Sequence, residues 1–252
     1  LAFLDPAGRH FHFTFEEDAA LADCPIMGLA NRPKKENSKT LRGKTCTRVF
    51  PNLGTFGPHY SALTANVKLV DGPSGNAGLF DENSRMGVFA MGPHHGGHAV
   101  SYALWIKTSS PENQLLINSG SIWSKALQGF LNLNLNDGIP EVMVSPQQRL
   151  TAETARLNDG QWHHLAAVMP NDGCLLSEVR LYVDGKAAKT RLAGADRKLR
   201  FNQAVRLGFG GLNYSNKGFD ALPVESFVGA MDEISIWTRP LDAAEIQALE
   251  VP

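Results

Sequence analysis

The sequence predicts an all-β protein, an antiparallel β-sandwich or barrel, and two observations lead to this prediction. Turn signals recur along the chain: Asn-Asp-Gly at 136–138, 158–160 and 171–173, and Val-Asp-Gly at 70–72 and 183–185. Asn-Gly and Asp-Gly steps supply the positive φ angles of tight hairpin turns. Between these turns lie short apolar or alternating segments at roughly ten-residue spacing, which is typical of an antiparallel sandwich or barrel.

Six segments alternate in hydropathy or are rich in β-branched and aromatic residues, and these are predicted as strands. They are residues 99–108, 130–136, 162–169, 178–185, 204–209 and 227–238. The second, FLNLNLN, has the clearest period of two, with apolar residues on one face and asparagines on the other. A short helix is predicted at 241–250, where Asp242 can cap the N-terminus and Glu245 follows three residues later.

Composition and charge narrow the class of partner. The chain has 252 residues, 43% of them hydrophobic, and a formal net charge of −1. A chain of this length can form one sandwich domain, and we expect residues 1–252 to do so. Because no broad basic face is implied, we expect no nucleic acid partner. No apolar run approaches the ~20 residues of a membrane helix, so we expect no direct membrane insertion.

Residues 24–60 interrupt the strand pattern and predict a basic surface loop inserted into the domain. Within them, residues 31–48 hold seven Lys or Arg among 18 residues. A local contact with a polyanion is the alternative interpretation. Cys24 and Cys46 are close enough in sequence to form a disulfide, which would suit an exported protein. The alternative is that all three cysteines of the chain are free thiols.

The second half of the chain resembles a known family. Its characteristic segments are DGQWHHLAAVMPNDG (159–173), VRLYVDGK (179–186), VRLGFGG (205–211) and FVGAMDEISIWTRPLDAAEIQAL (227–249). Their order resembles the LamG-like jelly-roll domains (laminin G-like, type 3) of the concanavalin A-like lectin/glucanase superfamily, as found in bacterial exported or FecR-associated proteins. Residues 11–18 are similar to the opening strand of that family, and residues 77–91 to its second strand.

The resemblance implies a concanavalin A-like β-sandwich jelly roll with a short C-terminal helix. It also implies an extracellular, periplasmic or cell-surface location. The adjacent histidines His163 and His164 could suggest a metal or a general base. Successive strand residues point to opposite faces, however, so these two side chains diverge and do not share one metal in the usual way.

Glycoside hydrolysis is the enzyme reaction considered first for such a fold, because it needs a pair of carboxylates at a defined separation. Related glucanases place theirs on one strand in an E-x-D-x-E pattern, which is absent from this sequence. The acids at 16–18 are consecutive, and Asp232 and Glu233 are adjacent. We therefore expect no catalytic residues. A glycoside hydrolase or lyase with residues gathered from separate strands is the alternative.

The acids have another use, because related jelly rolls often hold a structural calcium. That site takes an acid of the first strand, an acid of the last strand and backbone carbonyls, so the resemblance implies Glu16 or Glu17 together with Asp232. Calcium binds six to eight hard oxygen ligands. The alternative is that Asp232 accepts backbone hydrogen bonds and the glutamates are solvated. The turn that contains Asp81 and Asn83 is a second oxygen-rich candidate.

Sugar binding calls for an aromatic platform and for side chains that both donate and accept hydrogen bonds. Trp123 precedes the strand that presents Asn132 and Asn134, and a later loop carries Asn213 and Tyr214. These residues are predicted to contact a ligand. A solvated sheet face is the alternative for the two strand asparagines.

The glycine-rich stretch GPHHGGH adds His94 and His95, which could hydrogen-bond a sugar or, with His98, bind a transition metal. Trp105, Trp162 and Trp237 lie in apolar strands and are predicted to be core residues. Together these observations predict a non-enzymatic recognition module. We expect its ligand to be a carbohydrate or glycan, with a protein surface as the second option. A carbohydrate-active enzyme and a structural module of a larger surface protein are the alternatives, because one fold can host all three.

Overall fold

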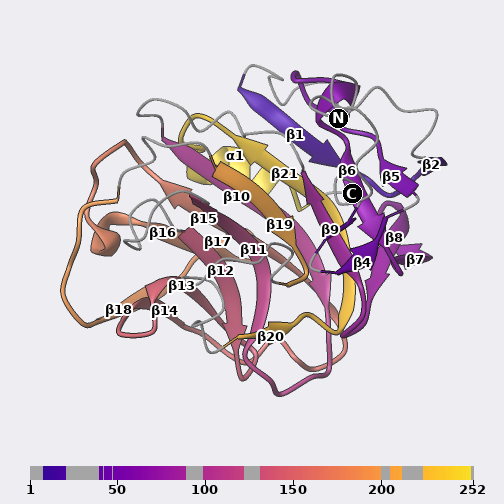
Figure 1. Ribbon diagram of the computed structural model, residues 1–252. Coiled ribbons are helices and arrows are strands. Elements are labelled where there is room, and N and C mark those ends of the chain that lie inside the picture. Colours follow the sequence, from indigo (N-terminus) through magenta and orange to yellow (C-terminus); the bar gives the residue numbers. More distant parts are fainter. Residues whose placement is uncertain are drawn as a thin grey trace.

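A computed structural model describes residues 8–20, 40–41, 43–46, 48–88, 99–121, 131–199, 205–211 and 224–250. These residues form two mostly antiparallel sheets, with one short α-helix against the outside of the smaller sheet (Figure 1). The all-β sandwich with a short C-terminal helix is therefore confirmed.

The smaller sheet has eight strands within the described ranges. Their order is β17-β16-β15-β10-β21-β8-β7, and β1 pairs with β21. The bounds are β1 (Arg9–Phe13), β7 (Lys68–Gly72), β8 (Gly75–Phe80), β10 (Val100–Lys107), β15 (Trp162–Met169), β16 (Arg180–Val183), β17 (Lys186–Ala187) and β21 (Gly229–Trp237).

The larger sheet has eleven strands within the same ranges. Their order is β18-β14-β13-β12-β11-β19-β9-β6-β5-β2, and β20 pairs with β11. The bounds are β2 (Ala19–Ala20), β5 (Arg48–Phe50), β6 (Ala62–Ala65), β9 (Arg85–Val88), β11 (Gln114–Ser121), β12 (Leu131–Asn136), β13 (Ile139–Ser145), β14 (Gln148–Glu153), β18 (Lys189–Ala193), β19 (Val205–Phe209) and β20 (Glu225–Ser226). The remaining elements are β3 (Thr40–Leu41), β4 (Lys44–Thr45), the 3-10 turns η3 (Pro58–Tyr60) and η4 (Leu176–Glu178), and the helix α1 (Ala243–Ala248).

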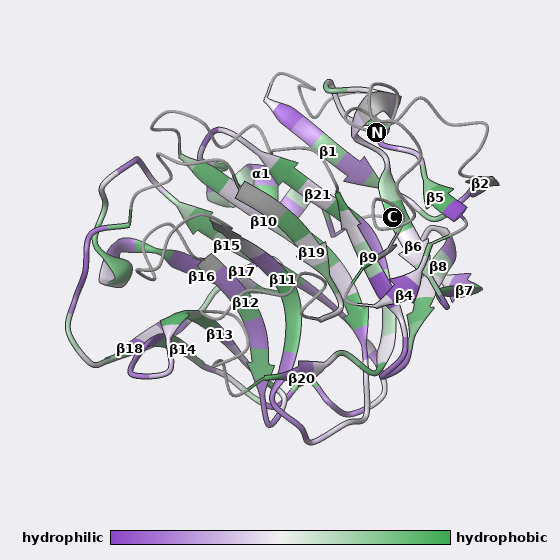
Figure 2. Ribbon diagram, in the orientation of Figure 1, coloured by the Kyte–Doolittle hydropathy of each residue, from purple (hydrophilic) through white to green (hydrophobic). Residues whose placement is uncertain are grey.

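The hydrophobic core lies between the two sheets, and alternation along each strand decides which side chains enter it. In β12, Leu133 and Leu135 belong to the core, whereas Asn132 and Asn134 lie on the opposite face. Figure 2 shows hydrophilic and hydrophobic bands alternating along several strands. The two sheets bury a large apolar area against each other, which is the main stabilising contribution to a sandwich.

One extra residue interrupts the alternation in β21. Ala103 of β10 pairs with Ser235, whereas Trp105 pairs with Asp232, so three steps along β21 match two steps along β10. Glu233 takes up the extra residue with a φ of 50°. This is the geometry of a β-bulge, which bends the strand and re-aims the side chains that follow it.

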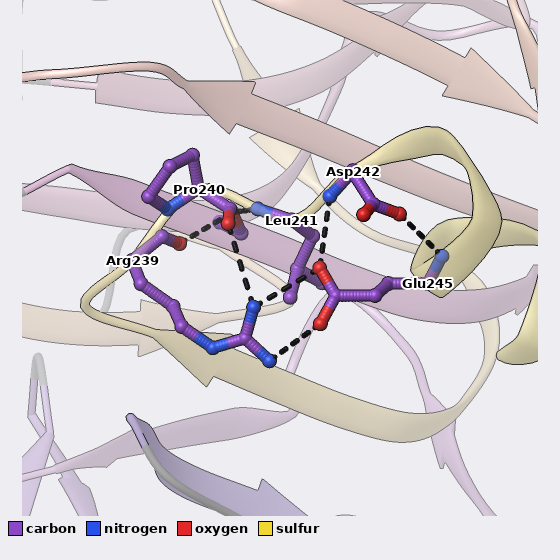
Figure 3. Close-up of polar contacts among 6 residues, drawn as sticks. Arg239, Pro240, Leu241, Asp242 and Glu245 are labelled. Carbon is purple, nitrogen blue, oxygen red and sulfur yellow. Dashed lines mark hydrogen bonds and ion pairs between the residues drawn. The ribbon is translucent and has the colours of Figure 1, made fainter. Parts of the chain in front are cut away.

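The helix α1 covers one end of the outer face of the smaller sheet. Asp242 caps it: the Asp242 carboxylate accepts from the backbone N–H of Glu245, and the Glu245 carboxylate accepts from the backbone N–H of Asp242 (Figure 3). Arg239 forms an ion pair with Glu245 over 2.7 Å. Leu241 and Ile246 are buried against Trp237. The helix and the cap predicted from the sequence are confirmed.

Two expectations need correction, and one open alternative is decided. Residues 77–91 do not form one strand, because β8 ends at Phe80 and β9 begins at Arg85 in the other sheet. The predicted loop at 24–60 contains β3, β4 and β5, and Phe50 of β5 is part of the core. Of the two interpretations of Cys46, the free thiol is the one observed: Cys46 is buried, and burial raises its pKa to about 11. Its suggested partner, Cys24, lies outside the described residues.

The close approach of the β8 backbone to the core gives the first prediction. A Cβ on Gly78 would lie 2.4 Å from Cε1 of the buried Phe15 ring. We predict that Gly78→Ala lowers the free energy of unfolding by about 1–3 kcal/mol, measured by urea denaturation. Lys68→Ala, at an exposed position of the same hairpin, is the control and should change this energy by less than about 0.5 kcal/mol. Equal effects of the two substitutions would contradict the packing.

Candidate functional site

Four polar side chains gather on the outer face of the larger sheet, and we call them the amide cluster: Asn118, Asn132, Asn134 and Glu141. The antiparallel register places Asn118 of β11 opposite Asn132 of β12, and Asn134 of β12 opposite Glu141 of β13. Asn118 Nδ2 donates to Asn132 Oδ1 over 2.7 Å. Asn134 Nδ2 donates to Glu141 Oε1 over 3.1 Å. The cluster therefore consists of two hydrogen-bonded pairs on three neighbouring strands.

The amide cluster is buried although it faces away from the core, and none of its members is more than 1% exposed. Three of its atoms have no hydrogen-bond partner within the described part of the chain: Asn118 Oδ1, Asn132 Nδ2 and Asn134 Oδ1. An unsatisfied buried polar group costs about 1–3 kcal/mol, and native proteins contain few of them. The cluster thus retains one donor and two acceptors that a bound molecule could satisfy.

Two polar side chains border the amide cluster on one side, and two glycines border it on the other. Thr151 Oγ1 donates to Glu141 Oε2 over 3.0 Å, and Arg149 Nε lies 3.9 Å from the same oxygen. On the other side, Gly208 of β19 and Gly87 of β9 continue the row that contains Asn118 and face each other in the register. Bare backbone therefore lies next to the amides on two strands.

The structure describes only two of the residues predicted to contact a ligand. Asn132 and Asn134 are buried, so the alternative of a solvated asparagine ladder is wrong, and their role in ligand binding stays a prediction. The others fall outside the described residues: Trp123, Asn213, Tyr214, His94 and His95.

The sequence reasoning missed Glu141, although a usable signal was present. The Asp137–Gly138 turn joins β12 to β13, and both turn residues have positive φ. A two-residue turn of this kind fixes the register, so counting outward from it pairs Asn134 with Glu141. Asn118 gave no such signal, because nine residues (122–130) separate β11 from β12. A connection of this length does not fix the register of the two strands.

Two carboxylates converge on the turn between β7 and β8, one from Glu16 after β1 and one from Asp232 of β21. Glu16 Oε1 accepts from the backbone N–H of Asn76 over 2.8 Å, and Asp232 Oδ2 accepts from that of Ser74 over 3.4 Å. Gly75 has a φ of 81°, and a Cβ on it would lie 2.4 Å from Glu16 Oε1. Of the two glutamates considered, Glu16 is therefore the one that reaches the turn.

The environment of Asp232 is unfavourable for an isolated negative charge. Burial raises the pKa of Asp232 to about 7, and the negative charges of Glu233 and Glu16 act in the same direction. No basic side chain among the described residues forms an ion pair or hydrogen bond with it. Within the same ranges, no three or more His, Cys, Asp or Glu residues form a group that could hold a metal ion. A hard cation would suit the two acids, but backbone oxygens would have to supply its other ligands.

His163 and His164 diverge as predicted. Burial lowers the pKa of His163, but hydrogen bonds to Asp184 at 3.0 Å and to Asp159 at 3.2 Å outweigh it and raise this pKa. His164 lies on the outer face beside Trp105, with ring centroids 5.3 Å apart. Burial lowers the pKa of His164 to about 4, so its ring is neutral near pH 7. The two rings therefore have separate structural environments.

The arrangement of the sheets and the closing β21–α1 segment can now be compared with known proteins. A family model described as "Concanavalin A-like lectin/glucanases superfamily" matches residues 86–247, more than half of the chain. The chain belongs to this superfamily. In the rat, "Sushi, von Willebrand factor type A, EGF and pentraxin domain-containing protein 1" is 29% identical over 160 residues, which are 60% of this chain and 4% of that protein. The chain thus matches only a small part of this curated relative.

Solved structures agree with the fold of this superfamily member. Domain 4 of AbnA, an extracellular GH43 arabinanase from Geobacillus stearothermophilus, was solved in complex with arabinotriose. It matches 76% of this chain and 89% of its own, with a TM-score of 0.55 and 18% identity. Domains LG4-5 of the mouse laminin alpha1 chain match 70% of this chain and 44% of their own, with a TM-score of 0.51 and 18% identity. At these identities the likeness establishes the fold alone. No helix among the described residues is long and apolar enough to cross a membrane.

The raised pKa of Asp232 gives a prediction about the metal-free protein. Because the folded-state pKa is about 7 and the ordinary value 3.8, Asp232 should lower stability progressively as the pH rises from about 4 to 7. Below that window the Asp232 carboxyl is protonated in the folded and the unfolded state. Above it, the loss of stability due to the ionised carboxylate no longer changes with pH. The stability of Asp232→Asn relative to wild type should therefore increase across this window, by more than ~1.4 kcal/mol, the equivalent of one pKa unit.

This prediction is measured by urea denaturation in EDTA at pH 4, 5.5 and 7.5. His164 has the opposite effect, because its lowered pKa favours the folded state as the pH rises from 4 to 6.5. Each variant is therefore compared with wild type at the same pH. Glu17→Gln, at an exposed acid near the turn, is the control. Stability curves for Asp232→Asn and wild type that run parallel across the window would contradict the prediction.

Proposed function

We propose that this chain is a non-enzymatic recognition module that binds a carbohydrate through the amide cluster. The observation that carries the proposal is the set of three buried amide atoms without hydrogen-bond partners. Sugar hydroxyls donate and accept hydrogen bonds, as amides do. One hydroxyl-rich ligand could thus accept from Asn132 Nδ2 and donate to Asn118 Oδ1 and Asn134 Oδ1. Such a ligand would recover part of the desolvation cost of these atoms.

Two further facts support this proposal. The chain belongs to a superfamily described by its lectins and glucanases, and a domain with the same fold was solved with arabinotriose. The cluster is buried, so a ligand that satisfied these atoms would have to reach side chains that are at most 1% exposed. Buried polar groups without hydrogen-bond partners lower the stability of the fold, and these groups do not pack in the core. A role in ligand binding would account for them.

The chemistry of the cluster favours binding over hydrolysis. A glycoside hydrolase needs two carboxylates on either side of the scissile bond. Glu141 is the single acid of the amide cluster, and its two oxygens accept from Asn134 and Thr151. A carboxylate held in this way can position an amide or accept from a ligand hydroxyl. An enzyme on the same fold is the second candidate, and it would require another acid near Glu141.

We also propose that Glu16 and Asp232 hold a structural calcium together with backbone oxygens. The support is the convergence of both acids on the β7–β8 turn and the raised pKa of Asp232. A divalent cation would offset the repulsion between the carboxylates and favour the ionised form of Asp232. A calcium here would join the beginning of the chain to β21 and stabilise the sandwich without contacting the glycan.

The binding proposal predicts that Asn132→Ala and Asn134→Ala each weaken glycan binding about tenfold or more, because each loses a hydrogen bond worth about 1.4 kcal/mol. Binding is measured by affinity electrophoresis against a panel of soluble neutral polysaccharides. Asn171→Ala, at an exposed asparagine of a distant turn, is the matched control. A wild-type protein retarded by none of the glycans would contradict the proposal. The proposal would also be contradicted if Asn132→Ala and Asn134→Ala were retarded as strongly as wild type. Shortened glycan products would show that the protein hydrolyses the glycan.

The calcium proposal predicts that millimolar calcium raises the melting temperature of the wild type at pH 8. The rise should be smaller at pH 5, where protons compete for Asp232. Asp232→Asn and Glu16→Gln should remove the calcium effect, and Glu17→Gln should keep it. Magnesium at the same concentration is the ionic control. An equal rise in wild type and Asp232→Asn would show that calcium acts elsewhere.

A further inference from the structure

An open groove lies on the outer face of the smaller sheet. Both sheets of the sandwich separate it from the amide cluster. It has a volume of about 740 Å³, and we call it the Trp162 groove. The side chains that matter to the argument are Lys68, Leu79, Lys107, Trp162 and Val228, and all of them line it. Its size lies within the range of ligand-binding clefts.

The register of five strands forms the groove. Lys68 of β7 faces Leu79 of β8, which faces Ala230 of β21. Ala230 faces Lys107 of β10, which in turn faces Trp162 of β15. Paired residues point to the same side of a sheet, so these five side chains form one row across the strands. With neighbouring strands ~4.8 Å apart, the row is roughly 19 Å long.

The side chains leave the middle of this row open. Ala230 is small and forms a buried floor, whereas Leu79 and Val228 are 37% and 42% exposed. Trp162 and Trp105 are partly exposed on this face, so the prediction that they are core residues is wrong. Trp237, on the same face, is fully buried under α1. The helix therefore covers one end of the outer face, and the Trp162 groove occupies the other.

The charges that point along the row are positive. Lys68 and Lys107 are exposed, and no ion pair joins either of them to another described residue. Asp71 and Asp81 border the groove, but alternation directs Asp71 to the opposite side of β7 from Lys68. Asp81 Oδ1 accepts hydrogen bonds within its own turn. The row thus holds Lys107 next to the Trp162 ring and Lys68 at its opposite end, and neither lysine forms an ion pair with another described residue.

We propose that the Trp162 groove binds an acidic glycan, a chain of sugars that carry carboxylate or sulfate groups. The apolar face of one sugar ring packs against the indole of Trp162. The acidic groups of the glycan lie against Lys107 and Lys68, which are three strand spacings, or roughly 14 Å, apart. The ligand is therefore extended and several sugars long. This site does not depend on the amide cluster, and either proposal can fail alone.

The test measures retardation of the purified chain by polygalacturonate, dextran sulfate and dextran in affinity electrophoresis at two salt concentrations. At least one acidic polymer should bind, dextran should bind at least tenfold more weakly, and added salt should weaken acidic binding. Trp162→Ala should weaken it about tenfold, the equivalent of 1.4 kcal/mol. Lys107→Gln should weaken it several-fold and reduce its salt dependence.

Two controls separate the possible causes. Lys189→Gln removes an exposed lysine from β18 of the other sheet and should leave acidic binding unchanged. All affinities are also measured in the Asn132→Ala background, where the amide cluster contributes least, and the loss caused by Trp162→Ala should be the same there. The proposal is overturned if neither acidic polymer binds, or if dextran binds the Asn132→Ala variant as tightly as dextran sulfate does. It is equally overturned if Lys107→Gln and Lys189→Gln have the same effect, or if poly-glutamate binds as well as polygalacturonate, which would indicate an acidic protein partner.

Discussion

The extra residue in β21 is the constraint on which most of this structure depends. The bulge at Glu233 allows Met231, Ile234 and Ile236 all to enter the core, which strict alternation would prevent. It also divides the partners of β21, because Gly229–Met231 pair with β8 and the residues from Ile234 onward pair with β1. The beginning of the chain therefore enters the smaller sheet beside the closing strand.

The same bulge determines where the acids lie. Asp232 turns toward the β7–β8 turn that Glu16 also contacts. Glu233 turns the other way and accepts from His12 over 2.7 Å. A strand without the bulge would place Glu233 on the core side, where an unpaired carboxylate would be costly. The bulge that keeps Glu233 out of the core thus also directs the buried Asp232 toward the turn contacted by Glu16, where we propose a cation.

Much of the fold could be predicted from the sequence, because turn residues and period-two alternation are local signals. Six strands and the capped helix were placed in this way, and β12 is the clearest example. Alternation could not reveal the bulge at Glu233, since Met231–Trp237 reads as a continuous strand. It also could not reveal that residues 77–91 change sheet. Both features depend on which strand lies alongside, and this information is not local.

Prediction of the candidate sites was weaker for a related reason. The sequence shows which face Asn132 occupies, but not whether something covers that face, so burial was unexpected. Trp162 was assigned to the core because its strand is apolar, yet its position at the strand end leaves it partly exposed. The row that joins it to Lys107 and Lys68 combines residues from strands far apart in sequence. Such a row becomes visible only when the strand order is known.

The two outer faces of the sandwich differ in chemistry, and this difference is what makes the account testable. The larger sheet presents buried amides whose hydrogen-bonding atoms lack partners, whereas the smaller sheet presents a partly exposed indole and two exposed lysines. The first arrangement suits hydroxyl groups held in place by hydrogen bonds. The second suits a charged chain attracted at longer range. One fold can carry both because each face is built from side chains that the core does not use.

The measurement that most directly tests the central claim is an NMR titration that follows the side-chain NH₂ signals of asparagine as a neutral glycan is added. The amide-cluster account predicts that the signals of Asn118, Asn132 and Asn134 shift together with one dissociation constant, while the signal of Asn171 stays in place. Saturable binding that leaves the three cluster signals unchanged would contradict the account and assign glycan recognition to another surface.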